Sequence, residues 1–200
     1  MKNSVCLIVC MCVSYFGFCQ LATDFDEILP FNDDLAAVKK DHQWGFISKK
    51  GDLVIDFRND FVLTKGEKGF SPEFNDKRCL IKRLKNGVYF YGFINEQGNE
   101  IIPATYLNAS NFENGYALVV VHLQDSIGYN KVLKKALRNS KIEEYIIDTS
   151  GEIIKYLENP INYTLPKNSH ENPPKLRSKF IAPHRVAVLK KDMKWDIYEF

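Results

Sequence analysis

The stretch YFYGFINEQGNEIIPATY, residues 89–106, contains the pattern that decides the fold. Aromatic side chains at Tyr91 and two residues further on alternate with Gly92, which is the period of a β-strand. Asn95 and Gly98 then occupy the first and fourth positions of a tight turn. Asn bonds the backbone further on, and Gly accepts the left-handed conformation of a bulged hairpin. A second apolar run follows, so the stretch predicts a β-hairpin.

The same turn occurs twice more, in ISKKGDLVI at residues 47–55 and in IDTSGEIIK at residues 147–155. The strand before the turn recurs as QWGFI and, in degenerate form, as EYII. AVLKKDMKWDIY, residues 187–198, aligns without a gap on AAVKKDHQWGFI, residues 36–47, and so places Trp195 at the position of Trp44. The recurring positions, which we interpret as structural, are Trp44, Gly45, Gly51, Tyr91, Gly92, Gly98, Gly151 and Trp195.

Each copy also opens alike, with FNDDLA, FNDKRC and FENGYA, and more loosely with Phe180 in the last copy. The chain is therefore predicted to hold about four units at a spacing near fifty residues. Their approximate boundaries are 31–73, 74–111, 112–179 and 180–200, within a single repeat domain over residues 20–200.

These units predict an all-β fold of tandem antiparallel β-hairpin repeats. An open, solenoid-like array and a closed, propeller-like one both fit the spacing. The strand register predicts that Trp44, Tyr91 and Trp195 pack in the core, and a stacking platform for sugars is the alternative. An aromatic side chain of a neighbouring strand is expected over each strand glycine.

An insertion in the third unit, GYNKVLKKALRNSK at residues 128–141, breaks the strand pattern. Asn130 is a plausible N-cap, and Val132, Leu133, Ala136 and Leu137 form a helical stripe, so we expect one short inserted helix. Lys131, Lys134, Lys135 and Arg138 would share its opposite face. That face is either simply solvated or a docking site for an anionic surface.

The first nineteen residues, MKNSVCLIVCMCVSYFGFC, carry a lysine and then an apolar run of about fourteen residues, the size of a signal-peptide core. We interpret residues 1–19 as a signal peptide cleaved near Cys19 and Gln20; an uncleaved anchor and a lipoprotein signal are the alternatives. Cys79 would then be the single cysteine of the exported chain, and its apolar setting indicates a buried structural thiol.

Composition and motifs point away from several classes of function. The chain is 45% hydrophobic and 13% aromatic, which indicates a folded protein, and its formal net charge of +2 gives no sign of nucleic-acid binding. His42, His122, His170 and His184 are scattered without a metal-ligand spacing. No nucleophile and base can be paired, so we predict no catalytic, metal or cofactor residues.

The chain combines aromatic-Gly-aromatic strands with Asn-x-x-Gly turns, most clearly in the run YGFINEQGNEIIPATYLNASNFENGYALV at residues 91–119. In these features it resembles the WG-repeat proteins, exported proteins of Bacteroidetes-type bacteria. Glu144 and Tyr145 stand where the family has Trp-Gly, and Asp196 replaces the last glycine. The resemblance implies hairpin repeats and export but no catalytic residues. We expect a non-enzymatic protein-binding or scaffold module at the cell envelope, or alternatively a binder of envelope glycan or anionic lipid that uses the basic helix.

Overall fold

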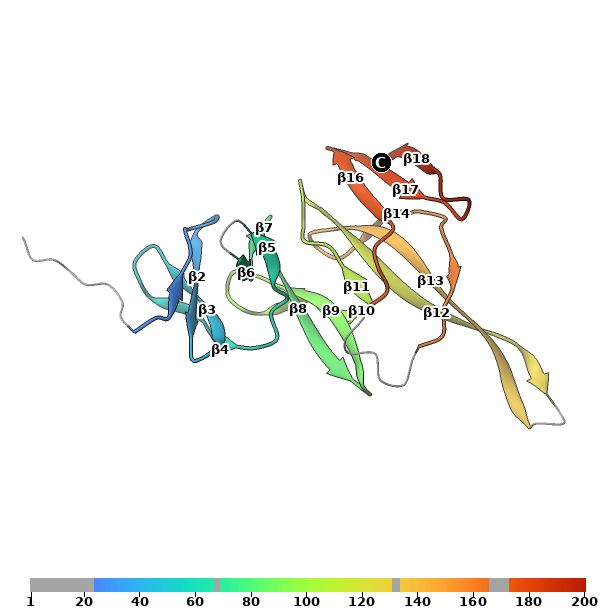
Figure 1. Ribbon diagram of the computed structural model, residues 1–200, viewed down its shortest axis with the longest axis horizontal. Helices are drawn as coiled ribbons and strands as arrows, with labels where there is room; N and C mark the ends of the chain where they lie inside the picture. Colours follow the sequence, from blue (N-terminus) through green and yellow to red (C-terminus); the bar gives the residue numbers. More distant parts are fainter. Residues whose placement is uncertain (1–23, 67–68, 131–133, 166–172) are drawn as a thin grey trace, which may run out of the picture.

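The computed structural model describes residues 24–66, 69–130, 134–165 and 173–200, and every regular element in these ranges is a β-strand. The strands form antiparallel meanders that follow one another along the chain, and no sheet closes into a barrel (Figure 1). The prediction of an all-β fold built from antiparallel hairpin repeats is confirmed. Because the described residues include no helix, none of them forms a helix that could cross a membrane.

Four sheets carry most of the strands. The first is β1 (Glu27–Ile28), β2 (Leu35–Lys40), β3 (Gln43–Ser48) and β4 (Leu53–Arg58). The second is β7 (Phe74–Asn75), β8 (Arg78–Lys85), β9 (Val88–Ile94) and β10 (Glu100–Tyr106). The third is β11 (Asn108–Ala109), β12 (Tyr116–Asn130), β13 (Lys135–Asp148) and β14 (Ile153–Tyr156), with β15 (Ile161–Asn162) also on β13. The fourth is β16 (Ser178–Ala182), β17 (Arg185–Leu189) and β18 (Trp195–Glu199). A separate small hairpin consists of β5 (Thr64–Gly66) and β6 (Gly69–Ser71).

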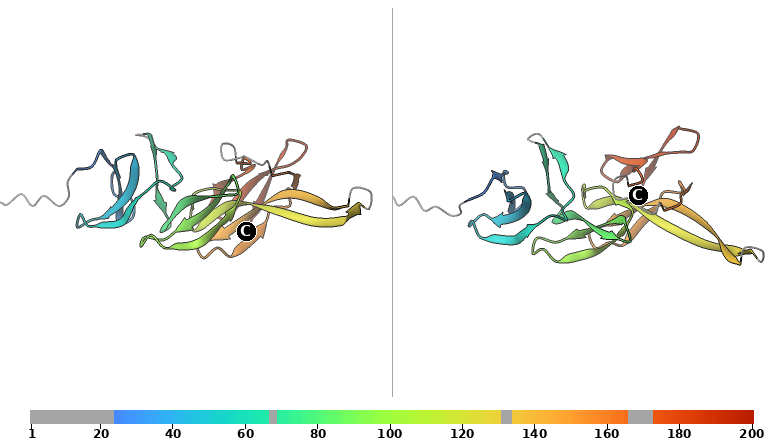
Figure 2. Two further views of the ribbon diagram at one scale, coloured as in Figure 1. Left: turned by 90° about the horizontal axis from the view of Figure 1, so that it is seen from below. Right: turned by 60° about the horizontal axis from the view of Figure 1, so that its bottom comes forward.

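The four sheets share one plan, and we call them units 1 to 4. Each has an opening strand, a second strand, a third strand that carries the aromatic-Gly motif or its replacement, and, in units 1 to 3, a fourth strand. Unit 1 and unit 4 lie far apart (Figures 1 and 2), so the array is open. The sheets of units 1, 3 and 4 begin before the predicted boundaries, because residues ahead of the opening motif already pair with the second strand. Leu29 N donates to Ala37 O, Leu107 N donates to Val120 O, and Ser178 pairs with Val188.

The turns after the third strands have the geometry that the sequence predicts. In unit 2, the Asn95 side-chain oxygen accepts hydrogen bonds from the backbone N–H groups of Gln97 (3.1 Å) and Asn99 (2.9 Å). Gly98 N donates to Asn95 O at 2.9 Å, and Gly98 has a φ of +80°. Asp148 makes the same contacts in unit 3, and the hydrogen bond from the Ser150 hydroxyl lowers the pKa of its carboxyl.

The predicted inserted helix is wrong. β12 and β13 continue through this insertion as one long hairpin, paired from Tyr116 opposite Asp148 to Asn130 opposite Lys135. Asn130 ends β12, and Val132 and Leu133 lie outside the described residues. The apolar spacing of the insertion fits a helix locally, but the two flanking segments pair with each other across the whole insertion, and that non-local pairing determines the structure.

Alternation along the strands sends neighbouring side chains into two different cores. In β8, Cys79 and Ile81 pack with the residues of unit 1, whereas Leu80 packs with those of unit 3. In β13, Ile147 contributes to the core shared with unit 2 and Ile146 to the core shared with unit 4. Each internal sheet is thus covered on both faces by its neighbours, and the main cores lie between units.

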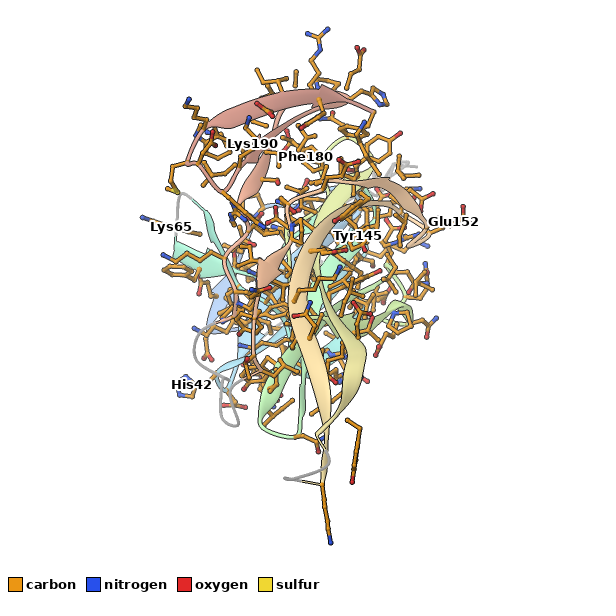
Figure 3. The ribbon with its side chains drawn as sticks, turned by 90° about the vertical axis from the view of Figure 1, so that its right-hand side faces the viewer. His42, Lys65, Tyr145, Glu152, Phe180 and Lys190 are labelled. Carbon is orange, nitrogen blue, oxygen red and sulfur yellow. The ribbon has the colours of Figure 1, made fainter. Side chains whose placement is uncertain are left out.

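An aromatic contact recurs at the junctions between units. Phe46 of β3 packs edge-on against Phe74, which opens unit 2, with ring centroids 4.8 Å apart. Phe93, at the equivalent position of β9, packs against Phe112, which opens unit 3, at 4.7 Å. At the next junction Ile146 takes the place of the aromatic residue and shares its core with Phe180 of unit 4, which lies between the two sheets (Figure 3).

The turn glycines supply a second repeated contact. A Cβ placed on Gly98 would lie 3.4 Å from Cγ2 of Ile55 in the preceding unit. A Cβ on Gly151 would lie 3.2 Å from Cγ1 of Ile102, the residue of unit 2 that is equivalent to Ile55. Each turn therefore rests on the fourth strand of the unit before it.

The strand glycines allow a close approach of backbone. A Cβ on Gly45 would meet Ile55 O at 2.9 Å and a ring carbon of Phe57 at 3.2 Å. A Cβ on Gly92 would meet Ile102 O at 2.5 Å and Ala104 N at 2.6 Å, with no aromatic ring among its three nearest atoms. The expected aromatic contact is thus seen at Gly45, whereas the nearest atoms at Gly92 are backbone atoms of β10. At both positions the fourth strand approaches the third closely.

We predict that Gly92→Ala lowers the free energy of unfolding by about 2 kcal/mol, because the new methyl group must push β10 away from β9. Chemical denaturation monitored by tryptophan fluorescence would measure the change. Gly66→Ala is the matched control, since its Cβ would meet nothing closer than the flexible Glu73 side chain, at 3.4 Å. Equal unfolding midpoints for the two variants would contradict the close approach.

Candidate functional site

The residue at the Trp position of the third strand differs in exposure between units. Trp44 is 4% exposed and Tyr91 is also buried, both within the cores between units. Trp195, at the equivalent position of unit 4, is 49% exposed, so it does not occupy the core position that the sequence predicts. The reason is its place in the array: the face that Trp44 turns toward unit 2 is, in unit 4, turned toward solvent.

This outer face of unit 4 is apolar at its centre and basic beside it. Ile197 is 65% exposed and pairs with Ala187, while Ile181 of β16 is also exposed. Lys179 Nζ lies over the Trp195 ring, 4.9 Å from its centroid. On the opposite face of the same sheet, Val186 and Val188 are buried against unit 3.

The gapless sequence match between units 1 and 4 hides a change of register. In unit 1 a two-residue turn at Asp41 and His42, both with positive φ, places Lys39 opposite Trp44. In unit 4 the turn is wider, since Lys190 N donates to Lys194 O, and Leu189 stands opposite Trp195. Relative to the sequence alignment, the second strand of unit 4 is thereby shifted by one residue against the third. The strand positions that face the preceding unit in unit 4 are therefore those that face the following unit in unit 1.

Glu144, which replaces the tryptophan in unit 3, is buried, and its carboxylate accepts hydrogen bonds from three groups. It accepts hydrogen bonds from the Asn159 side-chain amide, from the Ser178 hydroxyl (2.6 Å) and from Arg177 N (2.5 Å). Arg177 in turn donates to Leu189 O at 2.7 Å. The carboxylate therefore fastens unit 4 and the chain before it to β13, a role that sequence reasoning missed. Its signal is a charged residue at an aromatic position of the repeat.

The residues of the proposed docking helix lie on an arm. β12 and β13 extend away from the other strands as a two-stranded ribbon (Figures 1 and 2), and no other described strand pairs with residues 125–130 or 135–139. Tyr129 on this arm is 61% exposed. Lys134 lies in the turn at its tip with a φ of +49°, and its side chain is exposed.

The other described basic positions of the predicted helix do not share one face. Lys131 lies outside the described residues, and Lys135 and Arg138 belong to β13. Strand positions three apart belong to opposite faces of a ribbon. The arm therefore places positions 134, 135 and 138 near its tip, with positions 135 and 138 on opposite faces of the ribbon.

The base of the arm holds a small polar cluster. The Tyr145 hydroxyl donates to Glu143 at 2.8 Å, and Lys141 pairs with the same carboxylate at 2.8 Å. Burial, together with the hydrogen bond to Glu143, raises the pKa of Tyr145 to about 12. His122 Nε2 lies 2.6 Å from the Ser140 hydroxyl, and partial burial lowers the pKa of this histidine. The contact of His122 with Ser140 joins β12 to β13, whereas the contacts of Glu143 join residues within β13.

Cys79 and His42, whose side chains could in principle react or bind a metal, lie in separate places. Cys79 is fully buried, and burial raises the pKa of its thiol, so it is held as an unreactive core thiol. His42 is exposed in the β2–β3 turn, at the margin of the molecule (Figure 3). In the described ranges, no three His, Cys, Asp or Glu side chains are grouped as metal ligands.

A pocket of about 250 Å³ lies between unit 1 and the β5–β6 hairpin. Its walls are mainly apolar and include Leu35, Phe46 and Phe74, while Glu27 and Glu73 also line it. It can accept a small apolar group.

The comparison with known families matches the repeat pattern. The family described as "WG containing repeat" matches residues 22–41, 44–62 and 91–122. These segments cover most of unit 1, the β9–β10 hairpin of unit 2 and the first residues of β12; they stop before Glu144, the first of the replaced motif positions. No curated protein and no solved structure matches the chain significantly.

We predict that equivalent tryptophans contribute very differently to stability. Trp44→Ala should lower the free energy of unfolding by about 3–5 kcal/mol, because it empties a buried site between two units. Trp195→Ala should lower it by about 1 kcal/mol or less, because its ring is half exposed. Denaturant titrations of both variants in dilute solution would measure this, and equal losses would contradict the difference in burial.

Glu144→Ala should cost about 3 kcal/mol, since it leaves buried donors of Asn159, Arg177 and Ser178 without their acceptor. Thermal unfolding followed by circular dichroism would report the loss. Glu152→Ala is the control, because Glu152 is an exposed carboxylate of the same unit (Figure 3). If the two variants unfold at one temperature, Glu144 does not fasten unit 4.

Proposed function

The chain is a WG-containing repeat protein, and we propose that it is a non-enzymatic, exported module that binds other proteins at the cell envelope. The observation that carries this proposal is the β12–β13 arm. A two-stranded ribbon without a covering layer is at best marginally stable in water. The arm nevertheless reaches beyond the units that stabilise its base and exposes Tyr129. A contact surface for a partner accounts for such an extension.

The remaining architecture supports the same proposal. The large aromatic and aliphatic side chains of units 1 to 3 are used mainly to join one unit to the next. This leaves the loops, the outer faces and the arm to act as binding surfaces, as in other repeat arrays whose function is recognition. Export rests on the predicted signal peptide, residues 1–19, which lies outside the described residues.

A second candidate function is docking on an anionic glycan or lipid surface. The observation in its favour is that the arm carries Lys134 in its exposed turn and Lys135 in the strand that follows. Basic residues at the end of a projecting element can reach a charged surface ahead of the rest of the protein. Such binding would weaken steeply with salt.

One experiment separates the two candidates. Residues 126–138 are replaced by Asn-Gly, which joins the paired residues Asp125 and Asn139 through a two-residue turn. We predict that this shortened chain keeps the melting temperature of the full chain within about 3 °C, but no longer cross-links to the envelope proteins captured by the full chain in its native host. The N-terminus of the isolated protein, expected at Gln20, reports export in the same preparation.

The control is the full chain carrying Lys134→Glu and Lys135→Glu. Under the protein-binding proposal this variant captures the same partners as the unaltered chain. Its binding to vesicles that contain anionic lipid is then also the same as that of the unaltered chain. Salt-sensitive vesicle binding that is lost in this variant would favour the second candidate. Identical capture by the shortened and full chains would contradict a role of the arm.

A further inference from the structure

The last strand of unit 4 has one unpaired edge. In units 1 to 3 the third strand pairs on both sides, as β3 does with β2 and β4. β18 holds the same place in unit 4 and pairs with β17, while no described strand occupies its other side (Figure 1). An open strand edge offers a row of backbone donors and acceptors to another strand.

The hydrogen bonds around β18 show which backbone groups face this edge. Lys190 N donates to Lys194 O at 2.8 Å, and Phe200 N donates to His184 O at 3.1 Å. In an antiparallel ladder the hydrogen-bonded pairs recur at every second residue. The backbone groups of Asp196 and Tyr198 therefore face β17, and those of Trp195, Ile197 and Glu199 face outward.

The outward groups are almost all open to a partner. Glu199 O accepts a hydrogen bond from Lys155 Nζ at 2.9 Å. Among the described residues, no hydrogen bond involves the backbone of Trp195 or Ile197 beyond the β17 ladder. The outward positions Trp195, Ile197 and Glu199 include neither lysine nor proline, and Glu199 is the one charged residue among them. The side chains there include two large exposed apolar groups, Trp195 and Ile197.

We propose that a second copy of this chain covers the edge, with the two β18 strands paired antiparallel about a two-fold axis. Each copy contributes a three-stranded sheet, so the pair forms one continuous sheet of six strands. Ile197 stands opposite Ile197 of the second copy, and Trp195 stands opposite its Glu199. A two-fold axis requires one self-complementary patch, which is the commonest arrangement of homodimers.

Charge selects this register. A shift that centres the pair on Asp196 would place two carboxylates directly opposite each other, which is unfavourable across a strand pair. A shift to Tyr198 would place each Ile197 opposite a Glu199, which pairs an apolar side chain with a charged one. In the register centred on Ile197, Asp196 stands opposite Tyr198 of the second copy, and no like charges face each other.

The side chains beside the edge complement the same register. Lys179 Nζ lies 4.9 Å from the centroid of the Trp195 ring, on the outer face of the sheet. The second copy's Glu199, opposite Trp195, would enter that face next to this ammonium group. The pairing therefore buries the two isoleucines at the axis and sets an acidic and a basic group together on each side of it.

The test is the mass of the full-length chain in solution, measured by sedimentation over a range of concentrations. We expect twice the 23.1 kDa of the single chain, or twice the mass left after signal removal. Ile197→Pro removes an N–H that faces outward and leaves the β17 ladder intact, so it should raise the dissociation constant of the dimer at least about tenfold. Ile197→Asp should do the same by placing two carboxylates at the axis.

Ile101→Asp is the matched control, since Ile101 is an exposed isoleucine of unit 2 and its variant should remain dimeric. If Ile197→Pro does not fold, Ile197→Asp decides. A dimer that survives both Ile197 substitutions overturns the proposal. A chain that is monomeric at all concentrations also overturns it, including the case in which a strand of another protein occupies the edge. The arm-shortened chain should still dimerise, so this test is independent of the proposed function.

Discussion

The structure depends on the alternation of side chains along the second and third strand of each unit. A strand that sends one residue to the unit before it and the next residue to the unit after it cannot be satisfied within its own sheet. The pairs Phe46 with Phe74 and Phe93 with Phe112 show the result, because each joins a third strand to the opening residue of the following unit. Folding of one unit is thereby coupled to the presence of its neighbours.

The turn glycines show how local and long-range requirements meet at one residue. Gly98 adopts the left-handed conformation that ends its hairpin, and it also lies against Ile55 of the preceding unit. The sequence spacing predicts the first requirement directly. The second follows only from stacking, yet it recurs at Gly151 and Ile102, so the same spacing that closes the hairpin also sets the position of the next unit.

The repeat pattern was sufficient to predict the fold class, because turn residues and strand alternation are encoded within a few neighbouring positions. The arm was not predictable in the same way. Ala136 and Leu137 fit a helical stripe with the residues before them, and nothing in that window shows that the segment pairs with residues 126–130. Trp195 was assigned to the core on the strength of its motif, but its burial depends on whether a neighbouring element covers the strand, which a motif does not contain.

Lys155 has a consequence for how such an array can lengthen. It occupies the position held by Ile55 and Ile102 in the first two units, and it donates to Glu199 O instead of receiving a turn glycine. A duplicated unit inserted ahead of the third would find an isoleucine to rest on, whereas one inserted directly after it would meet an ammonium group. We therefore expect the regular stacking of turn glycine on isoleucine to end at the third unit, where Lys155 and Glu144 replace the residues of the repeat.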